Sequence, residues 1–303
     1  MRGVYHVLFY AIQNEDLTLD EEIYIFKTKR LQTEDEKLYI TLMTKEQLAS
    51  PIRAVGRLVI AWIEQTGAIF ILFGKILRSS IHLWRRRRLA VDQMLLIGVQ
   101  SLPLVSIIAV FTGAVSAWQA AYQFEGLVPL DYLGAGTSTA IFIELGPVLT
   151  GIILAGRVGS SIAAELGVMK VTEQIDALES LAIDPVHYLA LPRFCAATFM
   201  TPVLTIFSDF IAVLGALIVS NVLIGQPAHI FLDSVQASFE LRSLLGGLTK
   251  ALVFGATIAL IGCYIGFQTS GGAEGVGRAT IQAFVLSAAL ILIHDYVLAT
   301  ILF

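Results

Sequence analysis

The longest uncharged stretch of the chain is the feature that most constrains its fold. It runs for 32 residues, from Gln93 to Phe124, whereas an α-helix needs about 20 apolar residues to cross a bilayer. Four more apolar segments follow, at residues 132–166, 189–224, 243–269 and 279–303. Because backbone polar groups in lipid must be satisfied within the spanning structure, this pattern predicts an all-α integral membrane protein with five transmembrane helices.

The composition excludes several classes of protein. Of the 303 residues, 56% are apolar and 15% are charged, whereas soluble domains are about 25% charged. This composition therefore argues against an ordinary soluble enzyme and against a disordered chain. The net charge of −4 argues against nucleic acid as a partner.

Motifs for chemistry on this chain are missing. The sequence has no G-x-x-x-x-G-K-[ST], no H-E-x-x-H and no G-x-S-x-G, so it lacks these signatures of nucleotide binding, zinc proteolysis and ester hydrolysis. The two cysteines, Cys195 and Cys263, lie in apolar runs with no metal-binding spacing. We therefore predict no catalytic residue, no metal site and no cofactor bound by this chain.

The first 84 residues differ from the rest. Residues 1–50 hold nine acidic and six basic residues, and two runs, Ile23–Phe26 and Leu38–Ile40, have strand-like composition. We interpret them as a small acidic cytosolic extension whose role the sequence does not reveal. Residues 52–84 place their charges mainly on one side of a helix and are too often charged to span. They predict a helix in the membrane interface; a soluble helix packed on a core is the alternative.

Basic residues predict the orientation of the chain. The run Arg85–Arg88 directly precedes the first span, which is typical of a cytoplasmic flank rather than a nucleic-acid patch. Lys170, Arg193 and Arg278 then lie on the same side, and only Arg242 and Lys250 lie on the other. The amino terminus is predicted to be cytoplasmic and the carboxyl terminus to be on the outside.

Ionisable residues inside the spans are candidates for function because they are costly in lipid. Glu144 precedes Gly146-Pro147, which should bend or break its helix, and it has no base within four residues. We prefer a cavity-facing role for Glu144 over one in helix packing. A further set shares one helix face and predicts a structural polar seam: Arg157, Ser161 and Glu165. We expect His294 and Asp295 near the outer interface.

A short amphipathic helix is predicted between the second and third spans. Thr172 is placed to cap it and Pro185 to end it. The helix has an acidic edge and an apolar edge, and its apolar surface is too small for it to fold alone. It is either a surface helix or a docking element for a cytosolic partner. The candidate docking residues are Glu173, Gln174, Asp176, Leu178, Glu179 and Asp184.

The order of several motifs resembles the MlaE family of ABC-transporter permeases, the membrane subunits of MCE-type lipid transport systems. The matching motifs are Glu144–Val148 (ELGPV), Ala155–Ser161 (AGRVGSS), Ala164–Gly167 (AELG), Thr172–Leu178 (TEQIDAL), Asp184-Pro185, Pro192-Arg193 and Gly277–Thr280 (GRAT). The resemblance covers roughly residues 52–303 and leaves the first 50 without a counterpart.

The resemblance implies an assembly. It implies a homodimer of permeases bound to two cytosolic ATPase subunits, often with a STAS-domain subunit, and a periplasmic MCE-domain protein. ATP and Mg²⁺ would be bound by the ATPase. It also implies an interfacial amino-terminal helix, five spans and a cytoplasmic coupling helix at Glu173–Ile183 that fits a groove on the ATPase.

The resemblance further implies a lipid cavity at the dimer interface, in the inner membrane. By position, and with Gln119 added as a polar group facing the headgroup, its residues would be Ser116, Gln119, Gln123, Phe124, Leu127 and Glu144. Some relatives carry an arginine before the matching glutamate, whereas this chain has Ile143, so a local salt partner for Glu144 is missing.

We expect acyl chains of a lipid, with phospholipid first, to enter this cavity while ATP binding to the partner changes its shape. Two alternatives remain open from the sequence. One is an ion-coupled secondary transporter that uses Glu144, Asp209 and Asp295. The other is a membrane scaffold that transports nothing and whose acidic helix only docks a partner.

Overall fold

The computed structural model describes residues 56, 59–60, 63–79 and 87–303. The chain divides into two units, Met1–Gln65 and Thr66–Phe303, and the second unit carries all the features below. The predicted acidic extension at residues 1–50, with its strand-like runs, lies outside the described residues. So do parts of the predicted interfacial helix and of the basic run before the first span.

Helices make up every regular element of the described residues, in agreement with the predicted fold class. Five continuous helical segments are long and apolar enough to cross a membrane. They are Arg87–Phe124, Leu130–Val171, Val186–Ile224, Leu241–Phe267 and Gly272–Leu302. The predicted all-α fold with five spanning helices is thereby confirmed.

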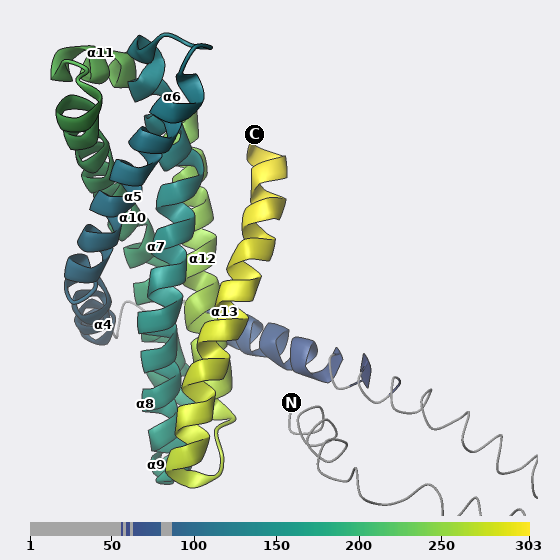
Figure 1. Cartoon of the computed structure of the whole chain (residues 1–303). Helices are drawn as coiled ribbons and strands as arrows, with labels where there is room; N and C mark the ends of the chain where they lie inside the picture. Colours follow the sequence, from purple (N-terminus) through teal and green to yellow (C-terminus); the bar gives the residue numbers. More distant parts are fainter. Residues whose placement is uncertain (1–55, 57–58, 61–62, 80–86) are drawn as a thin grey trace, which may run out of the picture. The chain divides into compact units, whose positions relative to one another are not determined.

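Most of the spanning segments are built from several elements in sequence (Figure 1). The first consists of α4 (Arg87–Val99) and α5 (Leu102–Phe124). The second consists of η2 (Leu130–Tyr132), α6 (Leu133–Ala140), η3 (Ile141–Leu145), α7 (Gly146–Leu154), η4 (Ala155–Gly159) and α8 (Ser160–Val171). The third consists of η5 (Val186–Ala190), α10 (Leu191–Val219) and η6 (Ser220–Ile224), and the last two are α12 (Leu241–Phe267) and α13 (Gly272–Leu302).

Short π-helical turns interrupt the second and third spans. Four of them, η3, η4, η5 and η6, are five residues long, and such turns recur at functional sites. The predicted break at Gly146-Pro147 takes this form: η3 ends at Leu145, and Pro147 lies in the first turn of α7. The chain thus changes its helical register beside Glu144 without leaving the helix.

Small residues bring the spanning helices into backbone contact. A Cβ atom added to Gly113 of α5 would lie 1.7 Å from the carbonyl oxygen of Ala212 in α10. One added to Gly215 of α10 would lie 2.3 Å from the carbonyl oxygen of Val110. Such close approach is typical of helix pairs in membranes, where packing replaces the hydrophobic effect.

The helical segment at residues 66–79 of the second unit lies within the range predicted for the interfacial helix. Leu72 and Ile76 are buried in the main core, and the ring of Phe73 meets that of Phe194 edge-on, with centroids 5.9 Å apart. Its other side exposes large apolar residues such as Phe70 and Ile71. An apolar surface on both sides suits a helix that packs on the bundle and faces lipid; its position in the interface stays a prediction.

One helix was not predicted. α11 (Ala228–Ser238) lies between the third and fourth spans and packs beside α6 at one end of the molecule (Figure 1). The backbone N–H of Ala135 donates to Ser234 Oγ at 3.0 Å, and a Cβ at Gly134 would lie 2.3 Å from the carbonyl oxygen of Phe231. The short amphipathic α9 (Gln174–Ser180) lies at the opposite end.

Candidate functional site

A groove of about 740 Å³ runs along α5 and the facing part of α6 and η3. Four of the six predicted cavity residues line it: Ser116, Gln119, Gln123 and Phe124. The remaining lining residues are mainly apolar and are Ile107, Ile108, Phe111, Thr112, Val115, Ala120, Gly136, Thr137, Ala140 and Leu145. The groove therefore joins an apolar wall to a few amide and hydroxyl groups, as sites for amphiphiles do.

The other two predicted cavity residues lie elsewhere. Leu127 is 83% exposed in the loop after α5 and does not line the groove. Glu144 lines a neighbouring open pocket of about 690 Å³, which also includes Ala299 and Phe303 of the last span. The two hollows share Gly136 and Ala140 of α6, so Glu144 lies close to the groove but outside it.

A buried lysine joins two carboxylates from different spans. Lys250 of α12 is fully buried. Its Nζ forms ion pairs with Glu144 of η3 and with Asp295 Oδ1 of α13, the latter at 2.9 Å. The ring centroid of Phe303 lies 5.8 Å from the same Nζ. One ammonium thus ties three spanning segments together, and we call Glu144, Lys250 and Asp295 the charge triad.

The charge triad brings together groups that the sequence did not pair. Glu144 has a salt partner, although 106 residues separate it from Lys250. Lys250, which the sequence counts among the bases of the outer side, is buried in the bundle on α12. Asp295 is largely buried against Lys250, and His294 Nδ1 lies 3.1 Å from the hydroxyl of Thr257. Contacts this distant along the chain depend on helix packing, which local patterns do not encode.

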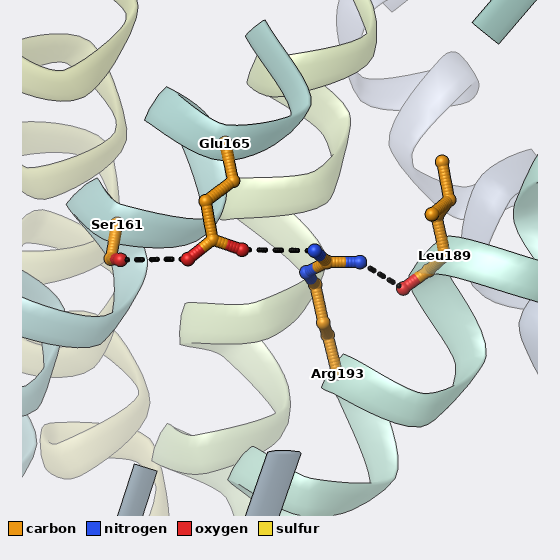
Figure 2. A network of polar contacts seen from close by, with 4 residues as sticks. All are labelled: Ser161, Glu165, Leu189 and Arg193. Carbon is orange, nitrogen blue, oxygen red and sulfur yellow. Dashed lines mark hydrogen bonds and ion pairs between the residues drawn. The ribbon is translucent and has the colours of Figure 1, made fainter. Parts of the chain in front are cut away.

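The predicted polar seam is only partly assembled. Ser161 donates a hydrogen bond to Glu165 at 3.2 Å, and Glu165 accepts a second from Arg193 of α10 at 2.9 Å (Figure 2). The other arm of the guanidinium donates to the carbonyl of Leu189 at 3.0 Å. Figure 2 shows this network bridging α8 and the start of the third span. The two bridged segments are those that flank α9.

Arg157 does not join that network. Its guanidinium donates to Ser101 and, at 3.0 Å, to the side-chain oxygen of Gln100. Gln100 and Ser101 form the junction between α4 and α5, so Arg157 ties the second span to the first. Side chains four residues apart on one face need not bond to each other when neighbouring helices offer better partners.

Arg193→Met should lower the stability of the chain by about 2 kcal/mol, because it removes charged hydrogen bonds to Glu165 and Leu189. Thermal unfolding in detergent measures the effect. Arg278→Met is the matched control, since Arg278 pairs with Glu274 on the exposed surface and its loss should change stability by less than about 1 kcal/mol. Equal shifts for the two variants would contradict a structural role for the bridge.

The acidic helix is present but differs in its boundaries. Thr172 follows α8 and donates to the carbonyl of Val168 at 2.8 Å, so it closes that helix and does not cap α9. α9 ends at Ser180, earlier than Pro185, which precedes η5. Glu173 has a φ of 61°, and this left-handed residue separates the two helices more sharply than a side-chain cap would.

The surface of α9 is acidic and open. Ile175 is buried, Leu178 is half-buried, and the remaining candidate docking residues are exposed: Glu173, Gln174, Asp176, Glu179 and Asp184. Asp176 pairs with Lys170 at 2.7 Å, and Asp184 accepts the N–H of Val186 at 2.9 Å. Ile175 thus anchors the helix while its charged side is free for contact.

Residues that could hold a metal ion are not gathered anywhere in the described part of the chain: it contains no cluster of three His, Cys, Asp or Glu side chains. Both cysteines are buried and unpaired. The candidate functional features of the described residues are the groove, the charge triad and the acidic helix.

Comparison with known proteins identifies the family. The family described as "Permease MlaE" matches residues 90–301. A "probable ABC transporter permease protein" of Rickettsia typhi is 40% identical over 253 residues, which cover 82% of this chain and 96% of that protein. A protein of the same description from Synechocystis is 40% identical over 242 residues, or 80% of this chain and 92% of that protein.

A plant protein is also similar. "Protein TRIGALACTOSYLDIACYLGLYCEROL 1, chloroplastic" of Arabidopsis thaliana is 35% identical over 229 residues, which cover 76% of this chain and 64% of that protein. The family match spans most of the described helices, and the bacterial relatives align over nearly their whole length. With five helices able to cross a membrane, this multi-pass membrane protein belongs to the MlaE family of permeases.

Proposed function

We propose that this chain is the membrane subunit of an ATP-driven transporter that moves lipids between the inner membrane and a periplasmic MCE-type carrier. The groove carries this proposal: its wall is apolar, as acyl chains require, and Gln119 and Gln123 supply polar groups for a headgroup. Phospholipid is the expected cargo. The Arabidopsis relative is named after a glycolipid, which also favours a lipid substrate.

A second copy of this chain is the proposed partner in the membrane. The groove is open along one side of the single chain, and large apolar residues nearby, such as Phe111 and Val115, are exposed. Two such grooves facing each other would form an enclosed cavity. The charge triad lies close to this face and would border the cavity on each side.

A cytosolic ABC ATPase is the proposed partner at α9. This chain would not hydrolyse ATP; the ATPase would bind ATP and Mg²⁺ and pull on the acidic helix. The bridge from Glu165 to Arg193 joins the segments on both sides of α9, so movement of α9 would be passed to the second and third spans together. A STAS-domain subunit is a further proposed partner of the same assembly. We place the amino terminus in the cytoplasm and the carboxyl terminus in the periplasm.

Photocrosslinking tests the lipid pathway. A Phe124→Cys variant, carrying a photoreactive label, is reconstituted with the ATPase in vesicles of phosphatidylethanolamine and phosphatidylglycerol. We expect the yield of lipid adducts at Phe124 to change about threefold or more when ATP is added, because the cavity changes shape. Phe210, exposed on α10 and outside the groove, is the control, and its adducts should not depend on ATP.

The other outcomes decide between the remaining functions. Lipid movement by the permease alone under a proton gradient would favour an ion-coupled transporter and overturn the proposal. A yield of lipid adducts at Phe124 that does not change with ATP, together with no lipid movement in any condition, would favour a scaffold.

A further inference from the structure

Asp209 is an acidic residue that the proposed transport cycle does not use. It lies within α10, is only 3% exposed, and its Oδ1 has no hydrogen-bond partner. None of the ion pairs found among the described residues includes it. An ionised carboxylate without a cation is strongly disfavoured in an apolar interior, so the neutral acid is the form that this site accommodates.

The carboxyl group of Asp209 faces the backbone of Gly146. A Cβ atom at position 146 would lie 1.7 Å from Asp209 Oδ1 and 2.8 Å from its Cγ. A carboxyl oxygen is not compressed to such a distance, so any residue other than glycine would displace the side chain of Asp209. The glycine and the aspartate are therefore matched in shape.

Gly146 stands at the break in the second span. The π-helical turn η3 ends at Leu145, and the N–H of Gly146 donates to the carbonyl of Ile141. The next residue, Pro147, has no N–H, so the carbonyl of Ile143 one turn earlier loses its usual α-helical donor. A protonated carboxyl group beside this break offers an O–H hydrogen-bond donor at the place where Pro147 has no N–H.

Glu144 lies inside that same turn, two residues before Gly146. Its direction toward Lys250 depends on the additional residue that a π-helical turn inserts, because a regular α-helix would rotate each side chain before the break. Whatever stabilises the turn therefore also sets the position of Glu144 in the charge triad.

We propose that Asp209 is a positioning residue: its protonated carboxyl group fills the notch at Gly146, donates a hydrogen bond to a backbone carbonyl freed by Pro147, and holds the π-helical turn that directs Glu144 toward Lys250. The proposal concerns the purified chain itself. Only its transport readout rests on the proposed function.

Infrared spectroscopy of the full chain in lipid tests the protonation of Asp209 directly. At neutral pH the difference spectrum between the parent and Asp209→Asn should contain one lost carbonyl band of a protonated carboxylic acid. A lost carboxylate band in its place would overturn the proposal. Because no transport is measured, this result stands whether or not the chain moves lipid.

Variants at the two positions test the positioning role. In the complex with the ATPase, Asp209→Asn keeps a donor of the same size and should transport lipid within about twofold of the parent. Asp209→Leu and Gly146→Ala should each lose about tenfold, since the first removes the donor and the second displaces it. Gly156→Ala is the control, because a Cβ there meets the ring of Phe284 at an ordinary 3.6 Å.

A double variant keeps the test decisive if Asp209→Leu fails to fold. Asp209→Ala removes both the donor and the oxygen that a Cβ at position 146 would meet, so adding Gly146→Ala to Asp209→Ala should cost no further transport. Equal loss in Asp209→Asn and Asp209→Leu, or a further loss when Gly146→Ala is added to Asp209→Ala, would overturn the positioning role. Absence of ATP-driven transport in the parent would instead count against the proposed function.

Discussion

Replacing Lys250 with methionine is expected to destabilise the chain by about 3 kcal/mol, because the substitution leaves two carboxylates without the cation that pairs with both. Lys250 is fully buried and Asp295 is 14% exposed, so water compensates little for the lost charge at Asp295, whereas Glu144 is 44% exposed and adds less to the loss. For a chain of this size the loss corresponds to a fall in Tm of about 6–12 °C. Thermal unfolding in detergent measures it.

Neutral partners should reverse most of that loss. Adding Glu144→Gln and Asp295→Asn to the methionine variant removes the uncompensated charges, and its Tm should return most of the way to that of the parent. Lys75→Met, at an exposed position, is the matched control and should change stability by less than about 0.5 kcal/mol. A parent-like Tm for Lys250→Met would show that the triad does not hold the spans together.

Reversing the charge of Asp176 is expected to abolish copurification of the ATPase. Asp176 is exposed on α9 and is paired with Lys170, so arginine there repels Lys170 and interrupts the acidic edge offered to the partner. Ile175, which anchors α9 in the core, is unchanged. Coexpression with a tagged ATPase followed by affinity purification gives the result directly.

Two controls separate docking from local damage. Lys170→Asp added to Asp176→Arg restores an ion pair between α8 and α9 but not the acidic edge, and we expect the complex to remain lost. Glu274→Arg reverses an exposed acid in the first turn of α13 and should leave the yield unchanged. Full recovery of the complex with Lys170→Asp would mean that α9 matters only for its own structure.

Local patterns predicted the spans because each helix satisfies its own backbone and needs only a run of apolar residues. The same patterns predicted the short helix α9 but not α11. α11 carries polar residues such as His229 and Asp233, and its apolar face is too narrow to stand out in a hydropathy reading. Its position follows from contacts with α6, which no local pattern contains.

The candidate site divides in the same way. The amides and Phe124 that line the groove were expected from the sequence, Gln119 as a polar group for the headgroup and the others by position from the family resemblance. The ion-pair partners of Glu144 and Glu165 and the hydrogen-bond partners of Arg157 could not be expected from local patterns, because each lies on another span. The sequence counts Lys250 among the bases of the outer side and does not reveal its burial beside Glu144 and Asp295.

The sequence by itself determined the all-α membrane fold, the five spanning helices and the family, because hydrophobic length and ordered motifs are written along the chain. Only the tertiary structure decided which charges meet, why Gly146 must be glycine opposite Asp209, and where the groove opens. These depend on how helices distant in sequence pack, and the energy of a buried charge is set by its neighbours in space rather than by those along the chain.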